Sequence, residues 1–400
     1  MTPRRVDVAI VGGGPAGALV AARLARAGHE VVLFERAPEY RWRACGVFSS
    51  PATIAALRRV GLDEPTLRRV ARPIPAMRVE SMAATAFRLT YGDAGRPWGS
   101  PVGFDRSALD PELLARARDA GADTRCGMRI DRMELGAGAV RSRLEARGPD
   151  GTERVDARIV VGADGLRSIV ARTADVARRA RLGRRVGLTF HLEEGPDAPL
   201  DARMRLIRDG YVGIAPVPGG RVNVGIVLGA SWTAALARDG AAGVVDDVLA
   251  AVPPGDWRHA RRLDPIAGAS PLGHRVTRRS GDGWLLVGDA AGFLDPFTGE
   301  GLHRAVVSAE LGARAVDAAL RGDREALTAY DRSMRHRFAG KDALSWLIQG
   351  FLGRPALFDY VARRLAARER VRETMGLVIG DLVPASRALD PRYLAALLRP

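Results

Sequence analysis

Residues 6–17 read VDVAIVGGGPAG, and this stretch decides the fold class. A short apolar run leads into three glycines that satisfy the pattern G-x-G-x-x-G. Apolar residues then recur at helical spacing over 15–27, and VVLFE at 31–35 is typical of a second strand. A strand, a helix and a strand within about thirty residues predict the start of a parallel, Rossmann-like sheet.

The glycine pattern predicts a dinucleotide site at this turn. Gly12 would allow the tight turn, Gly14 would let a pyrophosphate approach the backbone, and Gly17 would let the helix pack on the strand. Glu35, followed by Arg36, ends the second strand, where an acidic side chain would bind a ribose hydroxyl. The pattern alone suits FAD and NAD equally.

Two further apolar strands, expected at 157–161 and 284–287, each run directly into glycine and aspartate. The segment GADG follows the first strand at 162–165, and GDAAG follows the second at 288–292. Because these strands are distant in sequence from the first one, we expect one sheet to be completed from separate parts of the chain.

In this order the three motifs resemble the flavoprotein superfamily with the p-hydroxybenzoate hydroxylase fold, which includes aromatic-ring hydroxylases, geranylgeranyl reductase-like enzymes and flavin halogenases. The resemblance implies FAD as the cofactor. It implies that Asp289 binds the ribityl chain, that Asp164 lies near the pyrophosphate and that Arg106 contacts the cofactor from its helix. A helix starting near Gly299 would direct its free amides at the pyrimidine edge of the flavin. The predicted cofactor-binding residues are Gly12, Gly14, Pro15, Ala16, Gly17, Glu35, Arg36, Arg106, Asp164, Gly288, Asp289, Gly299, Glu300, Gly301 and Leu302.

The predicted fold is α/β: a Rossmann-like FAD-binding domain of the GR2 type, an inserted and mostly antiparallel sheet that holds substrate, and a helical C-terminal part. Alternating apolar residues over 77–90 and 202–229 predict the inserted sheet, with an apolar face but no distinctive polar cluster. A helix over 105–121 is expected to begin at Ser107 or Asp110, with Pro111 in its first turn. The predicted boundaries are 1–75, 102–178 and 268–320 for the FAD-binding domain, 76–101 and 179–267 for the substrate domain, and 321–400 for the helical part.

The reaction is less narrowly predicted than the cofactor. Gly292 stands where many hydroxylases of the superfamily have histidine, and Glu300 stands between glycines as in the reductase-like branch. The segment containing Tyr40, Trp42 and Cys45 resembles one that borders the flavin in geranylgeranyl reductases, with two aromatic residues shifted by one position. These features favour reduction.

Three hypotheses for the function remain open at this point. In a reductase, flavin N5 would deliver hydride to an isoprenoid-like double bond of a small apolar substrate, and Cys45 would supply the proton. In a monooxygenase, a C4a-hydroperoxide would hydroxylate or epoxidise the substrate, with Pro296 and Gly299 excluding water and Arg43 as a rival catalytic candidate to Cys45. The third hypothesis is a flavin-binding partner without turnover.

Composition excludes several other classes of function. The chain has 400 residues and a formal net charge of +15, and its basic residues are spread along the sequence with only 6% aromatic residues, which argues against nucleic-acid binding. Lys341 is the only lysine. The six histidines are scattered without metal-ligand spacing, so no metal site is predicted.

The setting and the electron donor are predicted from what the sequence lacks. No apolar run has membrane-spanning length and the two cysteines are far apart, which favours a cytoplasmic protein. Because a second G-x-G-x-x-G is absent, NAD(P)H is expected to dock only transiently as the donor. Apolar residues over 344–352 are followed by several arginines. This pattern suits helix packing, a lid over the substrate, or peripheral contact with a membrane. The oligomeric state is not predicted.

Overall fold

The computed structural model describes residues 3–40, 42–43, 46–93, 95–180, 182, 185–196, 198–252 and 260–399. Its first sheet has eight strands, and the central order is β19-β20-β11-β1-β2-β8. Strands β20, β11, β1, β2 and β8 run parallel to one another, as the sequence predicts, while β19 and β10 pair antiparallel with β20 and β11. The strands are β1 (Arg4–Val11), β2 (Val31–Glu35), β8 (Asp123–Cys126), β9 (Arg129–Glu134), β10 (Ser142–Gly148), β11 (Gly151–Gly162), β19 (Ser280–Gly281) and β20 (Trp284–Leu286).

Both faces of this sheet are buried. One face packs against α1 (Pro15–Arg26), α4 (Arg106–Asp119) and α7 (Gly301–Leu320), with α2 (Pro51–Arg59) and α3 (Glu64–Val70) beside them. The other face packs against the β9–β10 hairpin and α5 (Ile169–Thr173). Coverage on both faces explains why these strands are continuous apolar runs.

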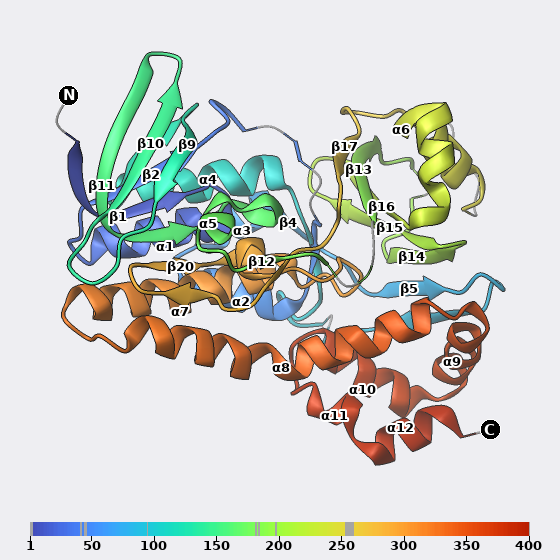
Figure 1. The fold of residues 1–400 in the computed structure, drawn as a ribbon. Helices are drawn as coiled ribbons and strands as arrows, with labels where there is room; N and C mark the ends of the chain where they lie inside the picture. Colours follow the sequence, from blue (N-terminus) through green and yellow to red (C-terminus); the bar gives the residue numbers. More distant parts are fainter. Residues whose placement is uncertain are drawn as a thin grey trace.

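A second sheet of seven strands lies beside the first (Figure 1). Its order is β17-β13-β16-β15-β14-β5-β6, and all neighbouring pairs are antiparallel except β14 with β5. The hairpin between β15 and β16 turns at Gly219 and Gly220, both with positive φ. The strands are β5 (Met77–Glu80), β6 (Ala86–Leu89), β13 (Val186–Glu193), β14 (Ala202–Ile207), β15 (Gly210–Val217), β16 (Arg221–Leu228) and β17 (Ala267–Ala269).

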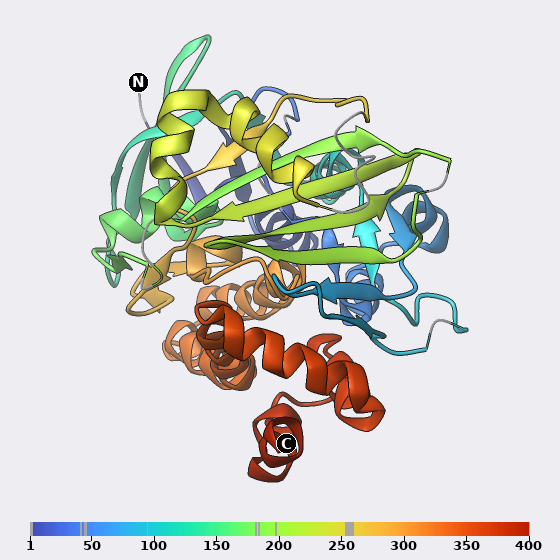
Figure 2. The same cartoon turned by 90° about the vertical axis from the view of Figure 1, so that its right-hand side faces the viewer.

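The C-terminal helices continue from α7 and end beneath the second sheet (Figures 1 and 2). The first half of α8 (Ala326–Leu352) packs on the first domain through Tyr330 and Phe338, and its second half packs on the second sheet through Leu344 and Ile348. The remaining helices are α9 (Pro355–Ala367), α10 (Glu369–Ile379), α11 (Ser386–Leu389) and α12 (Pro391–Leu398). Most of the apolar residues in this tail therefore take part in helix packing.

Small elements complete the fold. A three-stranded sheet, β3-β7-β4, lies between the two large sheets, and β12 pairs with β18. Within the described residues, no helix is long and apolar enough to cross a bilayer. The bounds are β3 (Phe48–Ser49), β4 (Ala71–Pro73), β7 (Val102–Phe104), β12 (Ala177–Arg178), β18 (Arg275–Val276), η1 (Gly165–Arg167), η2 (Ala230–Trp232), α6 (Thr233–Ala250) and η4 (Gly288–Ala291).

One predicted boundary is wrong. Helix α4 begins at Arg106 and is capped by Asp105, whose carboxylate accepts a hydrogen bond from the Ser107 amide at 2.9 Å. Pro111 consequently lies inside the helix and not in its first turn. The aspartate before the helix satisfies a first-turn amide, which neither Ser107 nor Asp110 could do from inside the helix. The predicted domain boundaries stay a prediction. Strand β17, at 267–269, spans the predicted boundary between the substrate domain and the FAD-binding domain at residue 268.

Candidate active site

The turn between β1 and α1 places the glycine pattern at the carboxyl edge of the first sheet. Gly12 has a φ of +107°, and a Cβ on it would lie 2.5 Å from the Ala163 oxygen. A Cβ on Gly17 would lie 2.0 Å from the Gly12 oxygen, so backbone packing requires glycine at both positions. A Cβ on Gly14 would meet nothing within 4 Å, which leaves this side of the turn open to a phosphate. Helix α1 begins at Pro15 without a side-chain cap, so its first amides remain available to an anion.

Glu35 closes the other side of this turn. Its carboxylate accepts hydrogen bonds from the amides of Gly13 at 2.8 Å and Ala37 at 2.9 Å, and it pairs with the Arg43 guanidinium at 2.6 Å. Burial raises the pKa of Glu35, but Arg43 and the two amides outweigh burial and hold the pKa below its ordinary value. The side chain is therefore a fixed carboxylate at the position predicted to bind a ribose.

A hollow of about 250 Å³ opens beside Glu35. Its lining includes Gly14, Glu35 and Arg43 from the first βαβ unit and the loop after it, and Arg118 from α4. Arg43 is predicted at the reacting end of the flavin, whereas the structure places its guanidinium here, in the part of the site that suits adenosine. Arg36 is exposed and is not among the residues that line the hollow.

The two glycine-aspartate segments lie at the same edge of the sheet. Asp164 accepts a hydrogen bond from the Ile169 amide at 2.6 Å, while its Oδ1 is buried without a partner and burial raises its pKa. Asp289 follows β20, and burial raises its pKa to about 6 although Arg106 and Arg304 oppose the shift. Burial makes the charged form of both aspartates costly. Hydroxyl groups of a bound ligand could donate hydrogen bonds to these carboxyl oxygens and offset that cost.

Arg106 lies close enough to Asp289 for its charge to oppose the rise in the pKa of that carboxyl, and its predicted contact with the cofactor stays a prediction. Its guanidinium is also held by Asp110 through two bonds of 2.6 and 2.8 Å, one helical turn away. The ion pair fixes the side chain at the start of α4, on the same edge of the sheet as the glycine turn.

Helix α7 begins beside Gly288 and Asp289, with the φ of +68° at Gly299 setting its entry. A Cβ on Gly299 would lie 2.8 Å from the Phe48 ring. No side chain caps the helix at Glu300, so the amides of Gly301 and Leu302 remain available to a ligand, as predicted for the flavin edge.

The side chain of Glu300 forms ion pairs within the protein, and its predicted cofactor role stays a prediction. It is buried and turned to the C-terminal helices, where Lys341 lies 3.1 Å from Oε1 and Arg304 lies 3.1 Å from Oε2. Lys341 is also 3.0 Å from Asp381, and Arg304 pairs with Asp342. The carboxylate is thus used to join α7 to α8 and α10, and only the backbone of residue 300 faces the site.

Pro296 lies in a segment that ties the first domain to the second sheet. The preceding Asp295 accepts a hydrogen bond from the Tyr211 hydroxyl at 2.5 Å and pairs with Arg185 at 2.7 Å. The Tyr211 ring also meets the Phe297 ring edge to face at 5.1 Å. The predicted location of the flavin ring, near Pro296 at the domain junction, therefore adjoins one face of the second sheet. Cys45, the other predicted catalytic residue, lies outside the described residues.

We call that face the open face, and define it by Thr189, His191, Tyr211, Gly213, Ala215, Asn223 and Gly225. The opposite side chains of the same strands, such as Leu188 and Phe190, pack on α6. Gly225 pairs with both Thr189 and Gly213 across the sheet. A Cβ on Gly225 would meet nothing nearer than the Gly213 oxygen at 4.0 Å, so the centre of the open face is bare.

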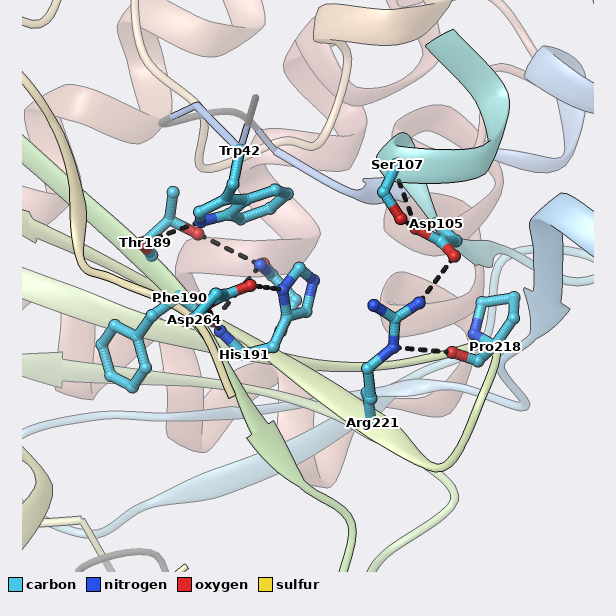
Figure 3. Close-up of polar contacts among 10 residues, drawn as sticks. Trp42, Asp105, Ser107, Thr189, Phe190, His191, Pro218, Arg221 and Asp264 are labelled. Carbon is cyan, nitrogen blue, oxygen red and sulfur yellow. Dashed lines mark hydrogen bonds and ion pairs between the residues drawn. The ribbon is translucent and has the colours of Figure 1, made fainter. Parts of the chain in front are cut away.

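Polar side chains lie on one side of this bare centre, which contradicts the expectation of a sheet without a distinctive polar cluster (Figure 3). Asn223 donates to the Thr189 hydroxyl at 3.1 Å, and His191 pairs with Asp264 at 2.6 Å. Trp42 covers the His191 ring at a centroid distance of 4.3 Å and donates to the Thr189 oxygen at 3.2 Å. Odd-numbered polar residues between apolar ones in 188–192 are the signal that could have indicated this cluster.

The residues present fit FAD. Two helix N-termini lack side-chain caps, the backbone of Gly14 faces open space, and the hollow beside Glu35 suits a nucleoside. The buried, unpartnered oxygen of Asp164 lies between these features and calls for a donor. Within the described part of the chain, no three His, Cys, Asp or Glu side chains are grouped to hold a metal ion.

Comparison with known proteins agrees with this fit. A family model described as FAD binding domain matches residues 5–341. The chain belongs to this family of FAD-binding proteins. With its relatives, it is a FAD-dependent oxidoreductase of the superfamily with the p-hydroxybenzoate hydroxylase fold.

Relatives of this flavoprotein include reductases. Digeranylgeranylglycerophospholipid reductase of Methanoculleus marisnigri is 30% identical over 344 residues, which cover 82% of this chain and 81% of the relative. Menaquinone reductase of Mycobacterium tuberculosis is 30% identical over 334 residues, covering 78% of this chain and 76% of the relative. A geranylgeranyl bacteriochlorophyll reductase-like crystal structure from Thermoplasma acidophilum superposes with a TM-score of 0.79 at 22% identity, covering 100% of this chain and 97% of that one.

Proposed function

We propose that this flavoprotein reduces a carbon–carbon double bond in a polyisoprenoid chain that lies against the open face. The bare centre at Gly225 carries the proposal, because it leaves space on this face beside the segment that contains Pro296. Ala215 and Tyr211 border this space within an otherwise apolar cluster. Geranylgeranyl groups and the side chain of menaquinone are both polyisoprenoid, so the names of the relatives point to the same class of substrate.

Bound FAD would supply a two-electron hydride for the reduction. The residues of the chain would hold it extended, with Glu35 at the ribose, the amides of α1 at the pyrophosphate and Asp289 at the ribityl chain. The amides at the start of α7 would stabilise negative charge on the reduced pyrimidine edge. We further propose NAD(P)H as a transient donor that recharges the flavin.

An isoprenoid lipid would reach the protein from a bilayer, and we propose peripheral contact through the C-terminal helices. Trp346 on α8, Leu398 on α12 and Leu382 in the turn between α10 and α11 are exposed apolar side chains. Arginines such as Arg363 and Arg370 accompany them and would favour an anionic surface. Co-sedimentation with phosphatidylglycerol vesicles, compared with phosphatidylcholine vesicles, tests this contact: equal binding to both, or none, contradicts the electrostatic part.

The test of the proposed reaction is anaerobic. Flavin-loaded protein is reduced with dithionite, the excess is removed, and geranylgeraniol is added while the oxidised flavin band is followed. Return of that band, with product heavier by two hydrogen atoms for each reduced bond, supports the proposal. A product heavier by one oxygen atom, formed only after oxygen is admitted, would identify a monooxygenase instead. Parallel reduction by NADH and by NADPH tests the donor.

A further inference from the structure

His191 lies on the open face, next to its bare centre. It alternates along β13 with Phe190 and Leu192, which pack on α6, so its side chain extends from the opposite side of the sheet. Its register partner on β16 is Asn223, and the next pair along the strands is Thr189 with Gly225. On the open face His191 therefore lies between the bare centre at Gly225 and the pair of Glu193 with Arg221, and the ring edge away from Asp264 is turned to the Arg221 end (Figure 3).

Asp264 holds this imidazole from one side. One carboxylate oxygen lies 2.6 Å from Nδ1, and the other accepts the His191 backbone amide at 2.7 Å. The two bonds fix the carboxylate, and a carboxylate in this position accepts a hydrogen bond from Nδ1–H. Nδ1 therefore carries hydrogen, and it is Nε2 that can exchange a proton with a ligand.

Nε2 is the atom without a role in the fold. His191 is 2% exposed, and Nε2 is buried without a hydrogen-bond partner among the described residues. In Figure 3 the imidazole edge opposite Asp264 lies beneath Trp42, on the side where Arg221 and Asp105 meet. By contrast, Nε2 of the buried His274 is 3.2 Å from the Ala290 oxygen. A buried unpaired nitrogen costs roughly 1–3 kcal/mol, so its retention indicates a partner that arrives with the ligand.

We propose that His191 is the catalytic proton donor of the reduction, and that Asp264 is its positioning residue. The inference rests on the proposed function, because it assigns the second half of the same reaction. Asp264 stabilises the imidazolium and sets the ring so that only Nε2 can transfer a proton. Trp42 packs on the ring and shields it from bulk water.

The step balances with the groups already named. Reduced FAD, when bound, would supply the hydride for one new C–H bond at the first carbon of the double bond. The π electron pair forms the second C–H bond with the Nε2 proton, so the substrate gains two electrons and two hydrogens. The imidazole is left neutral, with its hydrogen on Nδ1 still donated to Asp264, and Nε2 regains a proton from solvent.

The test separates the two half-reactions in flavin-loaded protein. His191→Gln keeps an amide near Nε2 but cannot transfer a proton, and His29→Gln is the matched control. His29 also pairs with an aspartate, Asp317, at 2.6 Å, but it follows α1 on the other side of the first domain. We expect His191→Gln to slow flavin reoxidation by geranylgeraniol roughly a hundredfold or more, with FAD content and dithionite reduction unchanged. The control should react like the natural protein.

Two further measurements distinguish proton donation from a structural role. Added imidazole should restore part of the reoxidation rate to His191→Ala, and Asp264→Asn should slow it at least tenfold. Reaction in D₂O should place one deuterium in each reduced bond, together with a solvent isotope effect that His191→Gln abolishes. Should His191→Gln not retain FAD, Asp264→Asn and the isotope effect in the natural protein decide.

The outcomes separate this inference from the proposed function. If geranylgeraniol reoxidises the natural protein and His191→Gln equally fast, His191 is not the proton donor, while the reduction itself stands. If the natural protein is not reoxidised at all, the proposed reduction fails and the role of His191 fails with it.

Discussion

The two faces of the second sheet are built from the same strands and differ in what their residues do. On the face against α6, Phe190 and Val224 are completely buried in an apolar cluster, and each such side chain contributes roughly 1.5–3 kcal/mol by leaving water. On the open face the next residues along the strands are His191 with an unpaired nitrogen and Gly225 with bare space above it. The face against α6 stabilises the domain by burying apolar side chains. The open face lacks part of that stabilisation, because it keeps an unpaired nitrogen and unfilled space that a ligand could use.

The largest effect should come from the face against α6. Phe190→Ala removes a fully buried ring from between the sheet and the helix, and should lower the free energy of unfolding by about 3–5 kcal/mol. Urea denaturation measures it, and Phe190→Leu, which keeps most of the volume, should cost less than about 1.5 kcal/mol. If Phe190→Ala lowers the free energy of unfolding no more than Phe190→Leu does, the face against α6 does not contribute the stability expected of it.

The comparison extends to Asp289 in the first domain, whose buried carboxyl also lowers the stability of the ligand-free protein. Burial raises its pKa to about 6 from 3.8, so folding favours the protonated form and the FAD-free protein should lose stability as pH rises from about 4 to 6. Asp289→Asn should remove this slope, stabilise the FAD-free protein above pH 6 by about 1–3 kcal/mol, and weaken FAD binding. Unfolding curves at several pH values measure it, and an unchanged slope in the variant contradicts the assignment.

Filling the bare centre should affect the ligand and leave the fold intact. Gly225→Val places a Cβ where no atom lies within 4 Å except the Gly213 oxygen, at 4.0 Å, so we expect the unfolding free energy to change by less than about 1 kcal/mol. Geranylgeraniol reduction should fall at least tenfold in kcat/KM, with a smaller fall for Gly225→Ala. Full activity with valine at this position would show that the substrate lies elsewhere.

The smallest effect should come from the edge of the open face. Tyr211→Phe removes one hydrogen bond to Asp295, which keeps its pairing with Arg185 and the Phe297 amide. Burial holds the pKa of Tyr211 well above its ordinary value, so the phenol donates this bond throughout the working pH range. The loss should be about 1 kcal/mol in thermal or urea unfolding. A loss beyond about 3 kcal/mol would mean that the junction depends on this hydroxyl.

The FAD site could be predicted because its signals are local. Gly12 and Gly17 are required by contacts within one turn and its neighbouring strand, and the spacing of Glu35 follows from the length of one helix. The same applies to the uncapped start of α7. Contacts between residues close in sequence depend on short motifs, and the structure has the turn geometry that these motifs predict.

The open face could not be predicted in the same way. Trp42, His191 and Asp264 come from three distant segments, and only the register of β13 and its loop connections bring them together. The contacts of the Glu300 side chain could not be predicted for a similar reason, since Lys341 approaches it from α8 and is itself paired with Asp381. The pairing of Arg43 with Glu35 was likewise not predicted, because it depends on the path of the loop after β2.

The burial of Lys341 gives the chain an unusual chemical property. Its amine is the only lysine amine in the sequence, it is 5% exposed, and it donates to the Val378 oxygen at 2.7 Å. Amine-directed reagents therefore have no lysine to modify while α8 and α10 remain packed together. The fraction of protein acylated at Lys341, measured over time by mass spectrometry, would therefore report how often the C-terminal helices open, with no introduced label.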